Sequence, residues 1–420
     1  MRKNGRDNRP YVKPVKRIEL SEKNIKLRWI AIVVLLSVAV VAILTGLVSA
    51  LNTEPGWQAV EVSSDQANCG SEFSLMYDFS EAGSAATAQY KQLTSLYSEA
   101  AVNAYRIFTP DVLEVSLFNV AYLNAHVNET VTVDETLYRS LALVAKYEDR
   151  HVFTAPAMVE YNRVFLCENE GEAARYVPAN NSETASWLAE LAKYVRDPEM
   201  ISLEVLGGNQ VRLKVSDAYL AFAKENEIET FLDFGWMKNA FIADYLADVL
   251  TENGYTNGYL SSYDGFTRNL DNRGQTYTMN LFDAQGVEIY MPTRMYYSRP
   301  MSIVFLRSYP LDELDRWHYF AFENGEVVTA LLDPADCMSK SSTENLVSYS
   351  TEYGCAEILL QTAPLFVVES FESDEVNALA ESGIYSIWFE GWTQKYNDAS
   401  IILEANEDGG AALYTCSLEK

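Results

Sequence analysis

The chain has 420 residues and a formal net charge of −27, with 48% apolar and 22% charged residues. This is the composition of a globular protein, and it excludes a wholly disordered or collagen-like chain. The charge is uneven, because residues 1–28 carry a net +7, residues 29–51 carry none and residues 52–420 carry −34. Since such an acidic surface repels phosphate backbones, we expect no nucleic-acid binding by the last part.

The first predicted element is a membrane anchor. Trp29 to Leu51 is a run of 23 uncharged residues, which as a helix is about 34 Å long at ~1.5 Å per residue and spans a ~30 Å hydrocarbon core. The Lys/Arg excess before it marks the cytoplasmic side. We therefore predict a single-pass protein of the cell membrane with a basic cytoplasmic tail (1–28), an anchor (29–51) and an extracytoplasmic remainder. A cleaved signal peptide is the alternative, but its apolar run is usually only ~7–15 residues long.

The exterior part is predicted to consist of a polar spacer (52–68) and one domain (69–420). Strands and helices mix in it without a strict βαβ alternation, which favours an α+β fold. Its five cysteines show no CxxC spacing. An oxidising compartment permits disulfides, so both bridges and buried free thiols stay open.

The first half of this domain starts with a strand, predicted within 69–79 from the alternation of Phe73, Leu75 and Tyr77. Apolar residues spaced by three to four predict helices over 84–108 and 134–147. The polar stretch 168–183 predicts a loop. Two alternating runs around Gly207-Gly208-Asn209 predict a β-hairpin within 197–214.

The second half starts with the clearest helix, over 237–252, which Gly254 ends. Strands follow at 287–291 and 302–309, and a hairpin over 320–332 turns at Asn324-Gly325. A short helix is predicted over 356–362, stopping before Pro364. The last predicted strands are 384–389 and 401–404.

No strong catalytic motif is present. The sequence has no GxGxxG, P-loop, HExxH or GxSxG. His126, His151 and His318 are isolated from one another, which favours structural roles; a zinc site could form from them only by long-range convergence. Carboxylates are so numerous that no pair stands out for glycosidase chemistry.

Six segments are more informative through their order and spacing. They are CGSEFS (69–74), NVAYLNA (119–125), HVFTAP (151–156), DFGWMKNAFIAD (233–244), LLDP (331–334) and AEILLQTA (356–363). In this order they resemble the FAD:protein FMN transferase family, the ApbE-type flavin transferases. The resemblance implies an ApbE-like α+β domain and a chemistry in which magnesium helps to break the pyrophosphate of FAD. FMN then passes to a threonine of a partner protein and AMP leaves.

The resemblance also implies site residues. Those matching cofactor-binding positions are Asn124, Asp233, Asn239, Asp244 and Asp333. Glu357 stands at the metal-binding aspartate of the family's acidic helix, with Gln361 or, in a register shifted by one, Thr362 as a further ligand. Oxygen donors of this kind suit the near-octahedral shell of magnesium.

Several positions depart from the family pattern. Trp236 replaces the second glycine of its GG pair, and we expect the indole to fill space near the nucleotide cleft. Asn239 replaces its lysine; Lys238 precedes it, but on a helix the two side chains point about 100° apart. The family's GGD turn is Tyr263-Asp264-Gly265 here, and Ala330 replaces its histidine. If that histidine transfers a proton, its loss lowers the rate by about 10²–10⁴.

These departures favour a catalytically silent relative that binds a flavin, a nucleotide or an exterior partner protein. One alternative is an active, magnesium-dependent FAD:protein FMN transferase that attaches FMN to threonine of exterior proteins. Another is an unrelated cell-surface binding module. The active case requires FAD and magnesium. The silent relative binds a flavin or nucleotide, or else a partner protein with no flavin, and the third interpretation includes neither cofactor; the sequence singles out no catalytic residue.

Overall fold

The computed structural model describes residues 55–114, 116–408, 411–412 and 414–419. The predicted tail (1–28) and anchor (29–51) lie outside these residues. Among the described residues, no helix has the length and apolar character needed to span a membrane.

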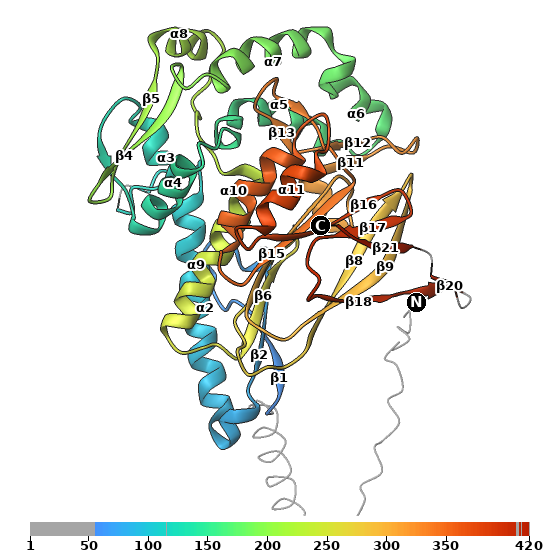
Figure 1. Cartoon of the computed structure of the whole chain (residues 1–420). Coiled ribbons are helices and arrows are strands. Elements are labelled where there is room, and N and C mark those ends of the chain that lie inside the picture. The colour runs from blue at the N-terminus through green and yellow to red at the C-terminus, as the bar shows by residue number, and fades with distance from the viewer. Residues whose placement is uncertain (1–54, 115, 409–410, 413, 420) are drawn as a thin grey trace, which may run out of the picture. The chain divides into compact units, whose positions relative to one another are not determined.

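A large sheet organises the described part of the chain (Figure 1). Its nine strands, in spatial order, are β1 (Trp57–Val60), β2 (Phe73–Asp78), β6 (Gly258–Ser262), β7 (Phe266–Asn269), β10 (Met301–Arg307), β15 (Asn345–Ser350), β16 (Tyr385–Glu390), β17 (Thr393–Tyr396) and β21 (Thr415–Leu418). Neighbours are antiparallel except β17 and β21. Every residue of β10 is buried, because both faces of the sheet are covered at its centre.

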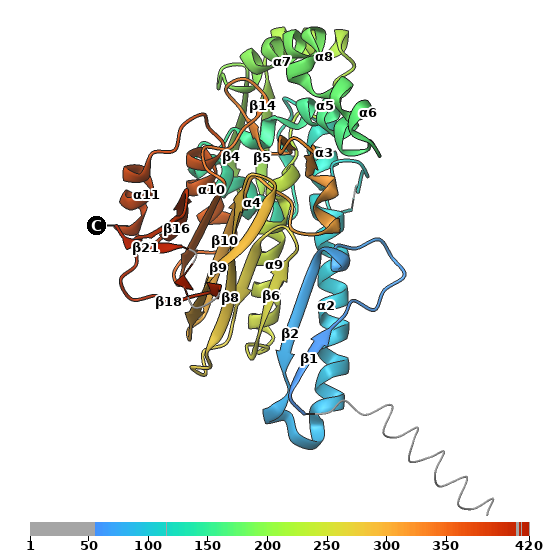
Figure 2. The same cartoon turned by 90° about the vertical axis from the view of Figure 1, so that its right-hand side faces the viewer.

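Helices cover one face of this sheet, as Figure 2 shows. They are α2 (Ala86–Phe108), α9 (Lys238–Glu252), α10 (Cys355–Phe366) and α11 (Ser373–Ala380). α9 contacts β6 and β7, whereas α10 contacts β10 and β15. The predicted three-to-four spacing in α2 is confirmed, since Leu93, Tyr97 and Ala104 are buried. α9 is the helix that places the candidate site.

A second sheet covers part of the other face. It consists of β8 (Tyr277–Gln285), β9 (Glu288–Tyr297) and β18 (Ile402–Ala405). Leu281 and Met295 of this sheet pack against Ile303, Phe305 and Val347 in an apolar cluster separate from the one under the helices. Most of the aromatic residues of 291–300 and 384–396 belong to this packing, which is the structural role that strand aromatics usually have.

Further helices and a small sheet form the upper part of Figure 1. They are α3 (Val120–Ala125), α4 (Glu135–Lys146), α5 (Ala155–Phe165), α6 (Glu170–Tyr176), α7 (Ser182–Val195) and α8 (Asp217–Glu225), with β3 (Val131–Thr132), β4 (Ile201–Gly207) and β5 (Gln210–Val215). The hairpin β4–β5 turns through Gly208 and Asn209, both with positive φ, as predicted.

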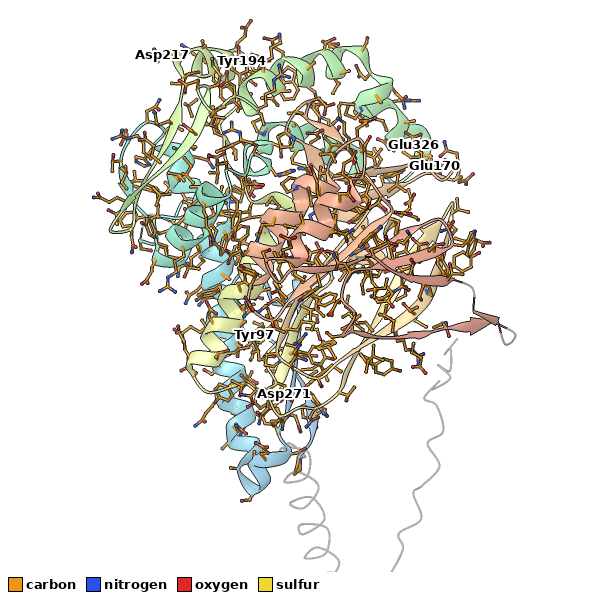
Figure 3. All side chains as sticks on the ribbon, in the orientation of Figure 1. Tyr97, Glu170, Tyr194, Asp217, Asp271 and Glu326 are labelled. Atoms are coloured by element: carbon orange, nitrogen blue, oxygen red, sulfur yellow. The ribbon has the colours of Figure 1, made fainter. Side chains whose placement is uncertain are left out.

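Short elements complete the fold. The 3₁₀ turns are η1 (Gly70–Glu72), η2 (Ser80–Ala85), η3 (His151–Phe153), η4 (Pro178–Asn180), η5 (Gly235–Met237) and η6 (Glu313–Trp317). The short strand pairs are β11 (Tyr319–Ala321) with β12 (Val327–Thr329), β13 (Leu332–Asp333) with β14 (Met338–Ser339), and β19 (Glu407–Asp408) with β20 (Ala411–Ala412). Figure 3 labels Glu170 of α6 and Glu326 beside the β11–β12 turn. The backbone N–H of Glu323 in this turn donates to the Glu170 carboxylate.

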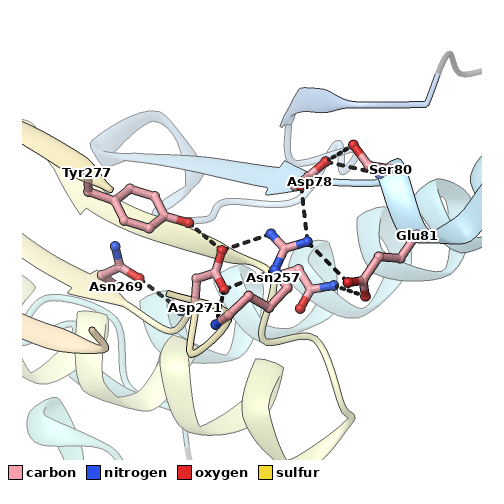
Figure 4. A network of polar contacts seen from close by, with 8 residues as sticks. Asp78, Ser80, Glu81, Asn257, Asn269, Asp271 and Tyr277 are labelled. Carbon is pink, nitrogen blue, oxygen red and sulfur yellow. Dashed lines mark hydrogen bonds and ion pairs between the residues drawn. The ribbon is translucent and has the colours of Figure 1, made fainter. Parts of the chain in front are cut away.

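A polar network fixes the edge of the large sheet (Figure 4). The buried Asp271 carboxylate accepts hydrogen bonds from Arg273 at 2.8 Å and from the Tyr277 hydroxyl at 2.5 Å. Arg273 also pairs with Asp78 at 3.1 Å. Burial alone would raise the pKa of Asp271, but these hydrogen bonds hold it below its ordinary value. The network therefore ties the start of β8 to the end of β2.

Three sequence predictions are wrong. Residues 168–183 form α6 and η4 and start α7, because Asn169 and Asn181 cap α6 and α7 through their side chains. α10 continues through Pro364 to Phe366, whose complete burial outweighs the hydrogen bond that proline removes. The spacer prediction fails at β1, which pairs with β2, so the folded part begins before residue 69. The strand predicted at 287–291 is β9, which continues six residues further to Tyr297, and the other predicted elements are present with small shifts of their ends.

Candidate functional site

A pocket of about 340 Å³ lies at the N-terminal end of α9. Residues from η1, η5, α9, the β6–β7 turn and η6 line it: Ser71, Glu72, Gly235, Lys238, Asn239, Tyr263, Asp264, Leu314, Trp317 and His318. A groove of about 740 Å³ between α5 and α7 is larger, but no predicted site residue lines it. The smaller pocket is the candidate site, because residues 69–74, 233–244 and 263–265 meet there.

Two glycines shape the turns around the pocket. Gly235 has φ +52°, and a β-carbon built there would have no protein atom within 4 Å. The wall is therefore open at Gly235. Gly265 has φ +110°, and its β-carbon would lie 2.5 Å from the carbonyl oxygen of Phe305. Only glycine accommodates this conformation together with this close approach to β10.

The polar centre of the pocket is the pair Asn239 and Asp264. The Asn239 amide donates to Asp264 Oδ2 at 3.0 Å. Oδ1 of each residue is buried and has no hydrogen-bond partner. Burial, joined by the Glu72 charge, raises the pKa of Asp264 to about 6 although hydrogen bonds from Ser262 and Asn239 oppose this rise. The pocket thus contains two buried acceptor atoms that the protein does not satisfy.

Lys238 supplies a positive charge beside this pair. Its Nζ lies 3.4 Å from Glu72 Oε2. Burial would lower the pKa of Lys238, but the charges of Glu72 and Asp233 raise it above the ordinary value. Lys238 is therefore charged at neutral pH, and Glu72 neutralises much of that charge. Lys238 and Asn239 line the same pocket.

His318 lies on the opposite wall. Its ring stacks with Tyr263, with centroids 6.3 Å apart and an interplanar angle of 12°. Burial and then the positive charges of Lys238 and Arg307 lower the pKa of His318 to about 4, so the imidazole is neutral at pH 7. Next to it, the buried pair Arg307–Asp315 anchors η6 with an N–O distance of 2.5 Å.

Asn239 is the one predicted cofactor residue that lines the pocket. Asn124 instead holds the segment before η5, because its Oδ1 accepts from the N–H groups of Phe231 and Leu232, each at 3.0 Å, and its amide donates to the Leu232 carbonyl at 2.8 Å. Asp233 follows that segment, and burial raises its pKa. Both residues position the Gly235 turn.

Asp244 and Asp333 have partners away from the pocket. Asp244 accepts the N–H groups of Cys355 and Ala356 at 2.8 and 2.9 Å and pairs with Arg268; it caps α10. Asp333 accepts the Ala335 N–H at 2.8 Å and pairs with Lys340 at 2.9 Å, which stabilises the turn after β13.

The three predicted metal ligands also have partners within the protein. Glu357 Oε1 accepts hydrogen bonds from Lys146 Nζ and the Tyr147 hydroxyl, both at 2.6 Å. Gln361 donates its amide to the Glu357 carbonyl at 3.1 Å, and the fully buried Thr362 donates its hydroxyl to the Ile358 carbonyl at 2.9 Å. The described residues contain no cluster of three His, Cys, Asp or Glu suited to a metal. This donor set does not fit the oxygen shell of magnesium.

Trp236 does not fill the candidate pocket. Its side chain is 7% exposed, packs in the apolar core and meets the His151 ring edge to face at 6.0 Å. It is absent from the pocket wall although its neighbour Gly235 is part of it. The expectation that the indole occupies this space is therefore wrong for this pocket.

Sequence reasoning missed some of the pocket residues. Glu72 lies within the segment 69–74 that carries the resemblance, and this segment could have indicated it. His318 and Trp317 have no such signal, because long-range contacts such as the Arg307–Asp315 pair bring η6 to the pocket. The five cysteines are free, and Cys69, Cys337 and Cys355 are buried, so the alternative of buried free thiols holds for these three.

No protein-family profile matches the chain, and no curated protein matches it. Among solved structures, it is similar to the ApbE protein of Thermotoga maritima, with a TM-score of 0.53, 12% identity, and coverage of 83% of this chain and 97% of that chain. It also matches a mutant of the flavin transferase ApbE from Vibrio cholerae, with a TM-score of 0.47, 14% identity, and coverage of 79% and 92%. The first match shows an ApbE-like α+β fold, which confirms the predicted fold.

Proposed function

We propose that this chain is a membrane-anchored, extracytoplasmic relative of the flavin transferases that binds a flavin or nucleotide in the candidate pocket without magnesium-dependent transfer. The fold, the open wall at Gly235 and the unsatisfied oxygens of Asn239 and Asp264 support binding. A buried polar atom without a partner is unfavourable, and a ligand N–H group would satisfy these acceptors if the pocket wall shifts to expose them.

One observation supports the proposed lack of transfer. The residues predicted to bind magnesium make contacts within the protein and do not line the pocket. Glu357 is paired with Lys146, and the hydroxyl of Thr362 is fully buried. The buried Ala330 also stands where the family has a histidine. In this proposal the pocket residues bind and orient the ligand, and no metal-dependent step follows.

The test is a titration of the full-length chain, purified in detergent, with FAD and Mg²⁺. We expect flavin fluorescence to be quenched at micromolar concentration with no AMP released above a metal-free control. Asn239→Leu should weaken binding, because it removes a pocket oxygen and the hydrogen bond to Asp264. Lys193→Met, at an exposed lysine on α7, is the control. Absence of flavin and nucleotide binding would contradict the proposal.

A second candidate is active transfer, and His318 favours it. The Ala330 N–H donates to the His318 carbonyl at 2.8 Å, so His318 lies beside the position of the family's histidine. Its neutral imidazole could accept the proton of a threonine hydroxyl. AMP release that His318→Gln abolishes without weakening flavin binding would establish this candidate instead.

The proposed location rests on residues 1–51 and has its own test. We expect the full-length chain in the membrane fraction and its C-terminal part cleaved by protease added outside intact cells. The anchor proposal fails if the chain stays in the soluble fraction, or if the protease cleaves it only after cell lysis.

A further inference from the structure

We infer that the ammonium group of Lys146 takes the place of a divalent cation at Glu357, so that an internal ion pair stands at the start of α10. This inference deepens the proposed absence of magnesium-dependent transfer, and it concerns Glu357, away from the candidate pocket.

The contacts at Glu357 carry this inference. Lys146 is the last residue of α4, and Tyr147 follows it. Both donate to the same oxygen of Glu357, each at 2.6 Å. Lys146 Nζ also lies 4.7 Å from the centre of the Tyr147 ring, within the range of a cation–π contact. A carboxylate oxygen, a hydroxyl and an aromatic ring thus surround one positive charge.

The neighbouring oxygens offer a metal little help. The amide of Gln361 is turned toward the helix backbone, and the hydroxyl of Thr362 donates to Ile358 in the core. Mg²⁺ takes about six oxygens at 2.0–2.1 Å, so water would have to supply most of them beside the Glu357 carboxylate. A dication near Glu357 would also be repelled by the ammonium group of Lys146, which lies 2.6 Å from Glu357 Oε1.

The pair has a structural consequence. α4 and α10 are far apart in sequence but in contact, and the ion pair links the end of one to the first turn of the other. Glu357 lies in the first turn of α10, where a negative charge is favourable, and Lys146 in the last turn of α4, where a positive charge is favourable. The link therefore needs no metal.

Mn²⁺ binding, followed by electron paramagnetic resonance on the full-length chain, tests this inference. We expect the wild-type chain to bind no Mn²⁺ through Glu357. Lys146→Met should gain a weak Mn²⁺ site at Glu357, since it removes the repelling charge, and Lys146→Met/Glu357→Gln should lose that site. Lys214→Met is the matched control, because Lys214 is 52% exposed in an ion pair with Glu204 and Lys146 is 57% exposed.

Two results would overturn the inference. One is Mn²⁺ binding by the wild-type chain that Glu357→Gln removes. The other is a Lys146→Met variant that binds Mn²⁺ no better than Lys214→Met. Flavin titrations of the same variants separate the two proposals, because failure of the proposed function would appear as lost flavin binding in the wild type, whatever the Mn²⁺ result.

Discussion

The pocket at the start of α9 and the first turn of α10 differ in how their polar groups are satisfied. In the pocket, Asn239 and Asp264 each keep a buried oxygen without a partner. At α10, Asp244 and Glu357 accept hydrogen bonds and ion pairs from the protein itself. Both regions match parts of one family site by resemblance. The difference is that the protein leaves polar groups unsatisfied in the pocket, whereas at α10 its own residues satisfy them.

The largest expected effect comes from removing the buried ion pair that anchors η6 beside the pocket. Asp315→Ala leaves the buried Arg307 without its partner and also removes the acceptor for the Leu311 and Asp312 N–H groups. Loss of one member of a buried pair costs about 3–5 kcal/mol. We expect a decrease of this size in the free energy of unfolding in urea, together with loss of flavin binding. Asp312→Ala, at the exposed cap of η6, is the control and should cost about 1 kcal/mol.

Asp264 gives a pH-dependent test of the pocket. Its pKa is raised to about 6 in the folded chain, against about 3.9 when unfolded. Between these pH values the folded chain keeps a proton that the unfolded chain has released. The free energy of unfolding therefore falls as the pH rises from about 4 to 6 and remains at this lower level above pH 6. Relative to Asp264→Asn, this loss is at most about 3 kcal/mol.

The measurement is the free energy of unfolding of both proteins across pH 4–7. Only their difference isolates Asp264, since many other carboxylates titrate in the same range. A difference that does not change with pH would mean that Asp264 is solvated, and the contrast between pocket and α10 would then weaken.

Local patterns allowed much of the fold to be predicted. The apolar spacing of α2 and α9 and the glycine turn of β4–β5 are properties of short segments. The loop prediction for residues 168–183 was wrong because helices that bury little apolar surface resemble loops in composition. The predicted end of α10 before Pro364 was wrong because the tertiary packing of Phe366 outweighs local helix propensity.

The site was less predictable because its contacts join distant segments. Asn239 lines the pocket as expected. The ion pair between Lys146 and Glu357, however, forms only because α4 and α10 meet in the folded structure. Sequence likewise could not show that Trp236 turns into the core toward His151, since that orientation depends on tertiary packing.

A substitution of Asp244 tests whether the polar groups at the start of α10 stabilise the protein. Asp244→Ala leaves the first N–H groups of α10 without an acceptor and Arg268 without its carboxylate. Loss of a helix cap together with a partly exposed ion pair should cost about 2 kcal/mol of unfolding free energy. The close approach of Gly354, whose β-carbon would lie 2.4 Å from Asp244 Oδ2, indicates that Gly354→Ala acts through the same contact. If Asp244→Ala instead abolishes flavin binding without lowering stability, α10 belongs to the ligand site.

The smallest expected effect is the change in the His318 titration that follows removal of the Lys238 charge. The pKa of His318 is lowered to about 4, first by burial and then by Lys238 and Arg307. Since the unfolded chain binds this proton at higher pH, the contribution of His318 to stability falls as pH drops from about 6.5 to 4, opposite in sign to that of Asp264. The chain has three histidines, so ring signals in NMR spectra can be assigned with His318→Gln.

The variant Lys238→Met separates the contribution of charge to the pKa of His318 from that of burial. Removing the Lys238 charge should raise the pKa of His318, whereas the larger contribution of burial remains. Lys193→Met should leave it unchanged. A His318 midpoint near 6.5 in the wild-type chain would mean that water fills this wall of the pocket, and ligand selection there would then depend on Asn239 and Asp264 without help from a neutral imidazole.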